Sequence, residues 1–161
     1  MERTRTFSWD DPIRGAEQAP TMAGFDYLHA MLKGDLPMPP IMKSLDLQVR
    51  SFDKGVAVFS FIPQEFHYNP LGMVHGGVIS AILDSAMGCS LHSTLPAGTG
   101  YTTVELKINF LKAITLKTGE LMATGKIIHS GTKTALTEAQ LIDQTGRIYA
   151  HGVSTCLILK Y

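Results

Sequence analysis

One apolar run constrains the fold of this chain more than any other feature. Over residues 74–95, apolar and small residues follow one another with almost no polar face, and Pro96 and Gly98 end the run. A helix that is apolar on all sides must be enclosed by other elements of a fold or by lipid. Asp84 lies in the middle of this run, and a carboxylate is costly at the centre of a bilayer. We therefore predict a buried helix over residues 77–95 of a protein without a membrane span.

Most of the remaining chain shows the alternation of apolar and polar residues that is typical of half-buried strands. The strand-like runs cover residues 45–50, 56–62, 103–110, 119–128, 134–142 and 147–159. Short turn sequences such as Asp53-Lys54-Gly55 join them, so neighbouring strands are expected to be antiparallel. The prediction is an α+β fold, in which one curved antiparallel sheet of about six strands wraps around the single apolar helix.

The N-terminal part of the chain has a different pattern. Residues up to Pro20 contain prolines and a glycine at irregular intervals and predict no regular element. From Thr21 to Gly34, apolar residues recur at three- and four-residue spacing, which predicts a short helix. The proline-rich residues 36–40 then end this segment. We therefore expect an N-terminal extension with a short helix at residues 1–40 and one main domain at residues 41–161.

Charge and cysteine content limit the class of function. The 14 Lys and Arg residues balance 14 Asp and Glu residues, so no overall charge draws the protein to nucleic acid or to a membrane surface. A ligand that carries phosphate groups must then be held by a local cluster of charge. Cys89 and Cys156 lie in apolar runs without metal-ligand spacing, which predicts buried thiols, no metal site and a reducing compartment. Because the N-terminus has no apolar signal segment, a cytoplasmic location is expected.

Three features coincide in residues 69–84, which lead into the apolar helix. Glycines punctuate the loop, His75 precedes the helix, and Asp84 is the only carboxylate between Glu65 and Glu105. Taken alone, each feature has a purely structural explanation, such as helix capping, close packing or a satisfied buried carboxylate. Together they favour acyl transfer to water, because N–H groups at a helix N-terminus stabilise negative charge on a carbonyl oxygen. A carboxylate in apolar surroundings is also a stronger base than one in water.

The whole segment resembles the signature of the hotdog-fold thioesterases, and in particular their phenylacetate-pathway (PaaI-like) branch. Members share N-x-x-G-x-x-H-G-G followed by an Asp on the central helix, and this chain matches at Asn69, Gly72, His75, Gly76, Gly77 and Asp84. The similarity extends over residues 45–159. It implies a hotdog fold and the hydrolysis of a medium-chain or aromatic acyl-CoA to free acid and coenzyme A. No cofactor is implied, since coenzyme A is part of the substrate.

The resemblance also implies roles for the residues of this segment. The Gly76 N–H polarises the thioester carbonyl, His75 and Asn69 position the carbonyl and the water, and Gly77 belongs to the substrate-binding backbone. Asp84 comes from the neighbouring subunit as general base or nucleophile, and the sequence leaves these two roles open. The active unit is then expected to be a homodimer, doubled into a tetramer as a dimer of dimers.

A hydroxyl residue on the following strand often helps to hold the water in this family, and its position suggests Thr103. Strict alternation leaves the choice open. It places Thr103 on the polar face of the strand, whereas Thr102 shares the face of Val104.

In the family, basic residues after the third strand and near a later turn meet the phosphates of coenzyme A. The matching candidates in this chain are Lys112 and the turn that contains Gly131 and Lys133. The alternative for both lysines is an ordinary solvated surface charge.

For two groups of apolar residues, the sequence does not decide whether they line a substrate pocket or belong to the ordinary core. Met22, Met31, Met38 and Met42 gather around the N-terminal helix, where they form either a flexible lid over the acyl group or simple packing. Tyr101 and Phe110 likewise face either the substrate or a buried sheet contact.

Two other functions compete with thioester hydrolysis. A hydratase or dehydratase on the same fold is suggested by Asn-Pro-Leu at residues 69–71, but Gly72 follows where that motif has a His, and His67 stands where it has an Asp. A non-catalytic acyl-CoA binding module is expected to lack the carboxylate or to carry a DNA-binding unit, whereas this chain keeps Asp84. Hydration of an enoyl-CoA, or binding of an acyl-CoA without turnover, would identify these alternatives.

Overall fold

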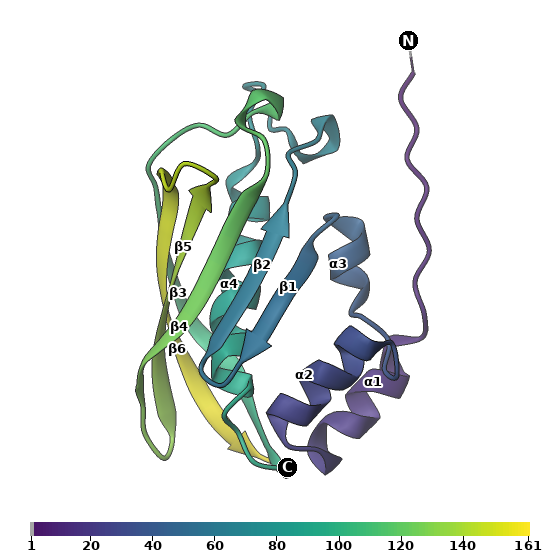
Figure 1. Ribbon diagram of the computed structural model, residues 1–161, viewed down its shortest axis with the longest axis vertical. Coiled ribbons are helices and arrows are strands. Elements are labelled where there is room, and N and C mark those ends of the chain that lie inside the picture. The colour runs from purple at the N-terminus through teal and green to yellow at the C-terminus, as the bar shows by residue number, and fades with distance from the viewer. Residues whose placement is uncertain (1) are drawn as a thin grey trace.

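A computed structural model describes residues 2–161 of the chain (Figure 1). Its helices are α1 (Pro12–Gln18), α2 (Gly24–Lys33), α3 (Pro40–Ser44) and α4 (Gly76–His92), with short 3-10 helices η1 (Ala19–Thr21), η2 (Glu65–His67) and η3 (Leu116–Thr118). Its strands are β1 (Gln48–Asp53), β2 (Val56–Phe61), β3 (Thr99–Phe110), β4 (Leu121–Ser130), β5 (Thr134–Asp143) and β6 (Ile148–Lys160).

The six strands form one sheet in the order β1-β2-β4-β5-β6-β3, and every neighbouring pair is antiparallel. The sheet curves around α4 (Figure 1), and the helix buries Ile82, Leu83 and Met87 completely. Gly125 of β4 lets the two backbones approach closely, because a Cβ at this position would lie 2.1 Å from the carbonyl oxygen of Ala86. The predicted fold is confirmed: one antiparallel sheet wraps around one apolar helix.

The N-terminal extension holds more helix than the sequence predicted. Helix α2 matches the expected helix and ends at Gly34, whose φ of 82° is in the left-handed region. Helix α1 lies in a stretch that was wrongly predicted to be irregular. The Asp11 carboxylate accepts a hydrogen bond from the Ile13 N–H, and Pro12 occupies the first turn. Helix α3 was also missed, since α1 and α3, with seven and five residues, are too short to show a helical period.

Helices α2 and α3 lie beside the edge of the sheet at β1 (Figure 1). Leu28 of α2 and Met42 of α3 belong to the same buried core as Phe52 of β1. Strand β1 begins at Gln48 rather than at residue 45, because Asp46 has a φ of 52° and turns the chain before pairing starts. The opposite edge of the sheet is β3, which pairs with β6 on one side only.

Strand β3 carries a bulge that decides which of its side chains face α4. The pairing with β6 shifts by one residue just after Thr103, and Val104 is the extra residue. A bulge inserts one residue and so interrupts the alternation of faces. Before the bulge, Tyr101 and Thr103 contact α4, and beyond it Ile108 packs against the core. Strict alternation therefore fails here, and Thr103 lies on the helix side of the strand while Thr102 is exposed.

Within residues 2–161, no helix is both long enough and apolar enough to cross a membrane. Both cysteines are free thiols; Cys156 is buried and Cys89 is half-buried. Burial, and to a smaller extent the nearby Asp84 carboxylate, raises the pKa of the Cys89 thiol to about 12, so this thiol stays protonated at neutral pH.

Two histidines lie in the interior. Both ring nitrogens of His67 are bonded to backbone groups. His92, at the end of α4, packs against the rings of Tyr27 and Tyr101, and neither of its ring nitrogens has a hydrogen-bond partner in the described part of the chain. Burial lowers the pKa of both imidazoles, because the charged form is poorly solvated there.

We expect the free energy of unfolding to fall as the pH is lowered below about 6.5, the ordinary value for histidine. In this range the unfolded chain binds more protons than the folded one, because the folded-state pKa values of His67 and His92 are lowered. Urea unfolding at a series of pH values measures the effect. The variant His92→Phe should show a shallower pH dependence, and His129→Gln, at an exposed position, should match the wild type. An unchanged slope in His92→Phe would contradict this account.

Candidate active site

The start of α4 presents one backbone N–H that nothing in the described chain uses. His75 is the N-cap of the helix, and its Nδ1 accepts a hydrogen bond of 2.8 Å from the Gly77 N–H. The Val78 N–H donates to the His75 carbonyl oxygen. The Gly76 N–H makes no hydrogen bond within residues 2–161. Of the two glycines, Gly76 therefore offers the free donor at the positive end of the helix.

A side chain at Gly76 would be crowded. A Cβ built there would lie 3.2 Å from Cζ of Phe110, the last residue of β3. Phe110 is itself 54% exposed, so its ring covers the helix start from the solvent side. Glycine leaves the narrow space beneath this ring open to a ligand carbonyl group.

Asn69 shapes the loop before the helix. Its Oδ1 accepts hydrogen bonds from the Leu71 N–H at 2.9 Å and from the Met73 N–H at 3.3 Å. Its backbone N–H donates to the Met73 carbonyl oxygen, and Gly72 takes a φ of 77° between them. The side-chain oxygen of Asn69 thus holds the turn, and its side-chain nitrogen, Nδ2, is the atom left to donate to a ligand.

Asp84 lies two turns into α4 and is half-buried. The Thr103 hydroxyl donates a 2.9 Å hydrogen bond to its Oδ1. The bulge after Thr103 makes this contact possible, because it keeps Thr103 on the helix side of β3 while Val104 turns outward. The second carboxylate oxygen, Oδ2, accepts no hydrogen bond within residues 2–161 and is available to a ligand or a water molecule.

A cavity of about 220 Å³ lies beside this carboxylate. Its lining combines the N-terminal extension, the first two strands, α4 and β3: Leu28, Met31, Met38, Pro39, Ile41, Met42, Val49, Phe52, Phe59, Asp84, Ser85, Cys89 and Tyr101. Three of the four methionines that the sequence grouped together border it, but Met22 does not. Tyr101 faces the cavity, which sequence reasoning left undecided. The contribution of β1 and β2 was missed, although their inward-facing aromatic residues were the available signal.

The two reactive positions of one chain are too far apart to act on the same carbonyl. Gly76 and Asp84 are eight residues apart on one straight helix, which places them about 12 Å apart along its axis. A carbonyl group is much smaller than this distance, so a single carbonyl group cannot lie next to both positions. The structure of one chain therefore brings together Asp84 and Thr103, and separately His75, Gly76 and Asn69, as two half-sites.

The residues predicted to meet coenzyme A lie at opposite ends of the sheet. Lys112 is exposed just beyond the end of β3, whereas Gly131 and Lys133 lie in the turn between β4 and β5. The Lys133 carbonyl oxygen accepts a hydrogen bond from the N–H of Ile158, which pairs with Tyr101 near the start of β3. A strand of twelve residues spans roughly 40 Å, so the two lysines of one chain are not close to each other.

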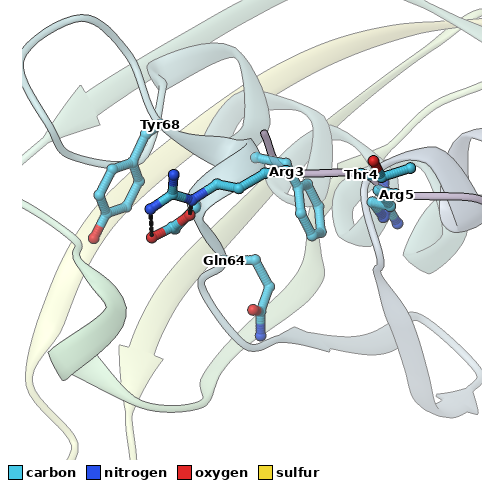
Figure 2. Close-up of a pocket in the computed structure, with 7 residues that line it drawn as sticks. Arg3, Thr4, Arg5, Gln64 and Tyr68 are labelled. Atoms are coloured by element: carbon cyan, nitrogen blue, oxygen red, sulfur yellow. Dashed lines mark hydrogen bonds and ion pairs between the residues drawn. The ribbon is translucent and has the colours of Figure 1, made fainter. Parts of the chain in front are cut away.

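The largest cavity described, about 660 Å³, shares no lining residue with the cavity at Asp84. Figure 2 shows it between the N-terminal segment and η2, with Arg3, Thr4, Arg5, Gln64 and Tyr68 around it. Arg3 forms an ion pair with Glu65 there. None of the residues of the sequence motif borders this space. Within residues 2–161, no three His, Cys, Asp or Glu side chains gather as they would around a metal ion.

A helix N-terminus with a free N–H, and a carboxylate beside an apolar cavity, are the groups that acyl transfer to water requires. On a hotdog sheet they define the class of this protein: a thioester hydrolase.

Comparison with known proteins gives the family. The thioesterase superfamily model matches residues 71–150. A Saccharolobus solfataricus protein that is provisionally named as an esterase is 30% identical over 120 residues, which are 74% of this chain and 84% of that protein. The 1,4-dihydroxy-2-naphthoyl-CoA hydrolase of Listeria monocytogenes is 25% identical over 118 residues, 73% of this chain and 93% of the hydrolase. The chain belongs to the thioesterase superfamily, as the motif in residues 69–84 predicted.

Solved structures agree with this assignment. The E. coli PaaI protein from the phenylacetic acid degradation operon superposes with a TM-score of 0.73 at 22% identity, over 85% of this chain and 94% of PaaI, which shows a shared fold. The structure of smu.793 from Streptococcus mutans, bound to acetyl-CoA, has a TM-score of 0.65 at 26% identity, over 71% of this chain and 89% of that one.

Replacing Thr103 by Val should lower kcat by roughly tenfold to a hundredfold, because a hydrogen bond to a charged carboxylate is lost while the β-branched shape is kept. Thr102→Val is the matched control, since Thr102 is exposed on the same strand and should have almost no effect. Steady-state hydrolysis of an acyl-CoA measures both variants. Equal effects of the two substitutions would show that the contact between Thr103 and Asp84 does not matter for turnover.

Proposed function

We propose that the protein hydrolyses a medium-chain or aromatic acyl-CoA to the free acid and coenzyme A. One observation carries the proposal: the Asp84 carboxylate is held by Thr103 at the border of an apolar cavity. A half-buried carboxylate on an otherwise apolar helix, with space beside it, is poorly explained by packing alone.

In the proposed reaction, the thioester carbonyl oxygen accepts a hydrogen bond from the Gly76 N–H, which stabilises the negative charge that develops there. As general base, Asp84 takes a proton from a water molecule, and the oxygen of this water attacks the carbonyl carbon. The tetrahedral intermediate then collapses, the carbon–sulfur bond breaks, and the leaving coenzyme A thiolate receives the proton that Asp84 took from the water. As nucleophile, Asp84 would instead form a mixed anhydride that water hydrolyses. Both routes use the same two groups.

Two further observations support coenzyme A as the leaving group. One relative is named as a CoA hydrolase, and one similar structure holds acetyl-CoA. Lys112, Gly131 and Lys133 are all exposed, as groups that bind phosphates at a subunit surface must be. Coenzyme A enters as part of the substrate, and the proposed reaction uses no other cofactor. We also propose that the protein is cytoplasmic, because its two free thiols fit a reducing compartment.

The competing functions find less support in the structure. For a hydratase, the residue at position 67 would have to be a free acid or base near the substrate. His67 is only 2% exposed; its Nδ1 accepts from the Gln64 N–H and its Nε2 donates to the Leu45 carbonyl oxygen. A pure binding module has no need of a carboxylate in an apolar cavity, since an unpaired buried charge opposes folding.

Asp84→Asn should lower kcat for thiol release by several orders of magnitude, because the amide can neither accept the proton nor attack the carbonyl. The fold should be kept, since the side chains are nearly isosteric and the Asn oxygen can still accept from Thr103. Thiol release from a panel of acyl-CoAs measures activity, and the urea unfolding midpoint checks the fold. Near-normal kcat in this variant would contradict the role of Asp84.

The two half-sites lead to a second part of the proposal, a homodimer. Strand β3 has one unpaired edge, and its apolar side chains Val104 and Phe110 are more than half exposed. A long, partly apolar edge strand is a ready surface for pairing with a second copy. A two-fold axis at this edge would place α4 of the two copies side by side in opposite directions, so that the Gly76 of one chain could face the Asp84 of the other. A dimer of such dimers is the proposed tetramer.

Mixing two inactive variants tests this composite site. Asp84→Asn and His75→Ala each damage a different half-site, so a mixed dimer contains one intact and one doubly damaged site. After full exchange of subunits, the mixture should recover roughly a quarter of wild-type activity, since half of the dimers are mixed and each has one working site. Labelled subunits and mass spectrometry verify the exchange. No recovery after verified exchange would mean that each chain carries a complete site.

A further inference from the structure

The cavity at Asp84 contains a polar group that the proposed reaction does not use. Tyr101 lines the cavity, and its hydroxyl makes no hydrogen bond within residues 2–161. The hydroxyl is not among the polar atoms that are fully buried without a partner, so a molecule in the cavity can reach it. A ligand that occupies the cavity is one source of the missing partner.

Tyr101 borders the cavity one helical turn along α4 from the carboxylate. Thr103 faces Asp84, and Tyr101, two residues earlier on the same face of β3, faces Gly88, one helical turn further along α4. A Cβ at Gly88 would lie only 2.3 Å from the Tyr101 hydroxyl oxygen, so the absence of a side chain there makes room for this oxygen. The hydroxyl is therefore about 5.4 Å, one helical turn, beyond the level of Asp84.

The cavity that Tyr101 borders is lined mostly by apolar side chains. The N-terminal extension contributes Leu28 and Met31, and the sheet contributes Phe52 and Phe59. Burial raises the pKa of Tyr101 well above its usual value, so its O–H stays protonated and can only gain a partner by donating to an acceptor or by accepting from a donor. A small, mostly apolar space with an unpaired hydroxyl on its wall recognises a ligand that is apolar along most of its length and carries one polar atom.

We propose that Tyr101 is a specificity-determining residue that donates a hydrogen bond to an oxygen at the far end of the acyl group. The cavity of about 220 Å³ then selects acyl groups that are short or contain a single ring and that carry a distal hydroxyl or carbonyl oxygen. This inference rests on the proposed function, because it takes the acyl group to extend past Asp84 into the cavity of the same chain.

A purely structural role for the hydroxyl is the competing explanation. The His92 ring lies with its centroid 5.7 Å from that of Tyr101, and its nitrogens also lack partners in the described chain. A water molecule or a small shift could join these two groups without any ligand. In that case the hydroxyl would affect all substrates alike, whereas a contact with the acyl group affects only those with a distal oxygen.

Matched pairs of acyl-CoAs separate these explanations. Each pair consists of an ω-hydroxyacyl-CoA and the acyl-CoA in which a methyl group replaces the hydroxyl, over a series of chain lengths. We expect the wild type to prefer the hydroxyl member at the best length by roughly threefold to tenfold in kcat/KM, the range for one neutral hydrogen bond. Tyr101→Phe should remove this preference and leave kcat/KM for the methyl member within about twofold.

The matched control is Tyr27→Phe. Tyr27 also packs against His92, but its hydroxyl donates to the Gly15 carbonyl oxygen and it does not border the cavity. This variant should keep the preference of the wild type. A wild type without any preference, or an equal loss for both members of each pair in Tyr101→Phe, would overturn the inference.

Binding to the Asp84→Asn variant keeps the test independent of turnover. The dissociation constants of the same pairs, measured by calorimetry with and without Tyr101→Phe, should show the same preference and its loss. If the wild type hydrolyses no acyl-CoA while this preference in binding is present, the proposed function fails and the inference about the cavity stands. If hydrolysis is found but neither measurement distinguishes the pairs, the inference fails alone.

Discussion

The enclosure of α4 by the sheet is the constraint on which the rest of this structure depends. A helix that is buried along most of its length tolerates few polar groups, because a polar group without a partner or an adjoining space destabilises the fold. Asp84 has both, since Thr103 donates to one carboxylate oxygen and the cavity lies beside it. The start of the same helix is also restricted. His75 caps the first turn and leaves one N–H, that of Gly76, without a partner in the described chain.

Because Gly76 and Asp84 both belong to α4, the reactive groups of one chain lie in two separate places. Eight residues of regular helix keep the donor at its start about 12 Å from the carboxylate. No rearrangement of side chains closes this distance, because both groups are fixed to the same rigid element. A second copy of the chain is the simplest source of the missing half, and the unpaired edge of β3 is the surface that the fold leaves open for it.

Sequence reasoning predicted the central helix, the antiparallel sheet and the family, because long periodic segments and the motif in residues 69–84 are local signals. It missed α1 and α3, which are too short to show a period. It also left Thr103 undecided, since a bulge depends on the pairing of β3 with β6 and cannot be read from β3 alone. The cavity could not be predicted from the sequence for a similar reason, because its walls come from four separate parts of the chain. The roles assigned to Asp84 and Gly76 stay predictions.

The origin of the cavity walls has a consequence for how such a protein can change over time. One wall is built from residues 28–42, which contain none of the groups proposed to break the thioester, while those groups all lie within residues 69–103. Mutations in the first segment reshape the space for the acyl group without disturbing the second. Part of the selectivity is thus inherited on a stretch of sequence that is separate from the reactive groups, while Tyr101 is inherited together with them. Exchange of the N-terminal helices can therefore change the size and shape of the cavity without replacing Tyr101 or the reactive groups.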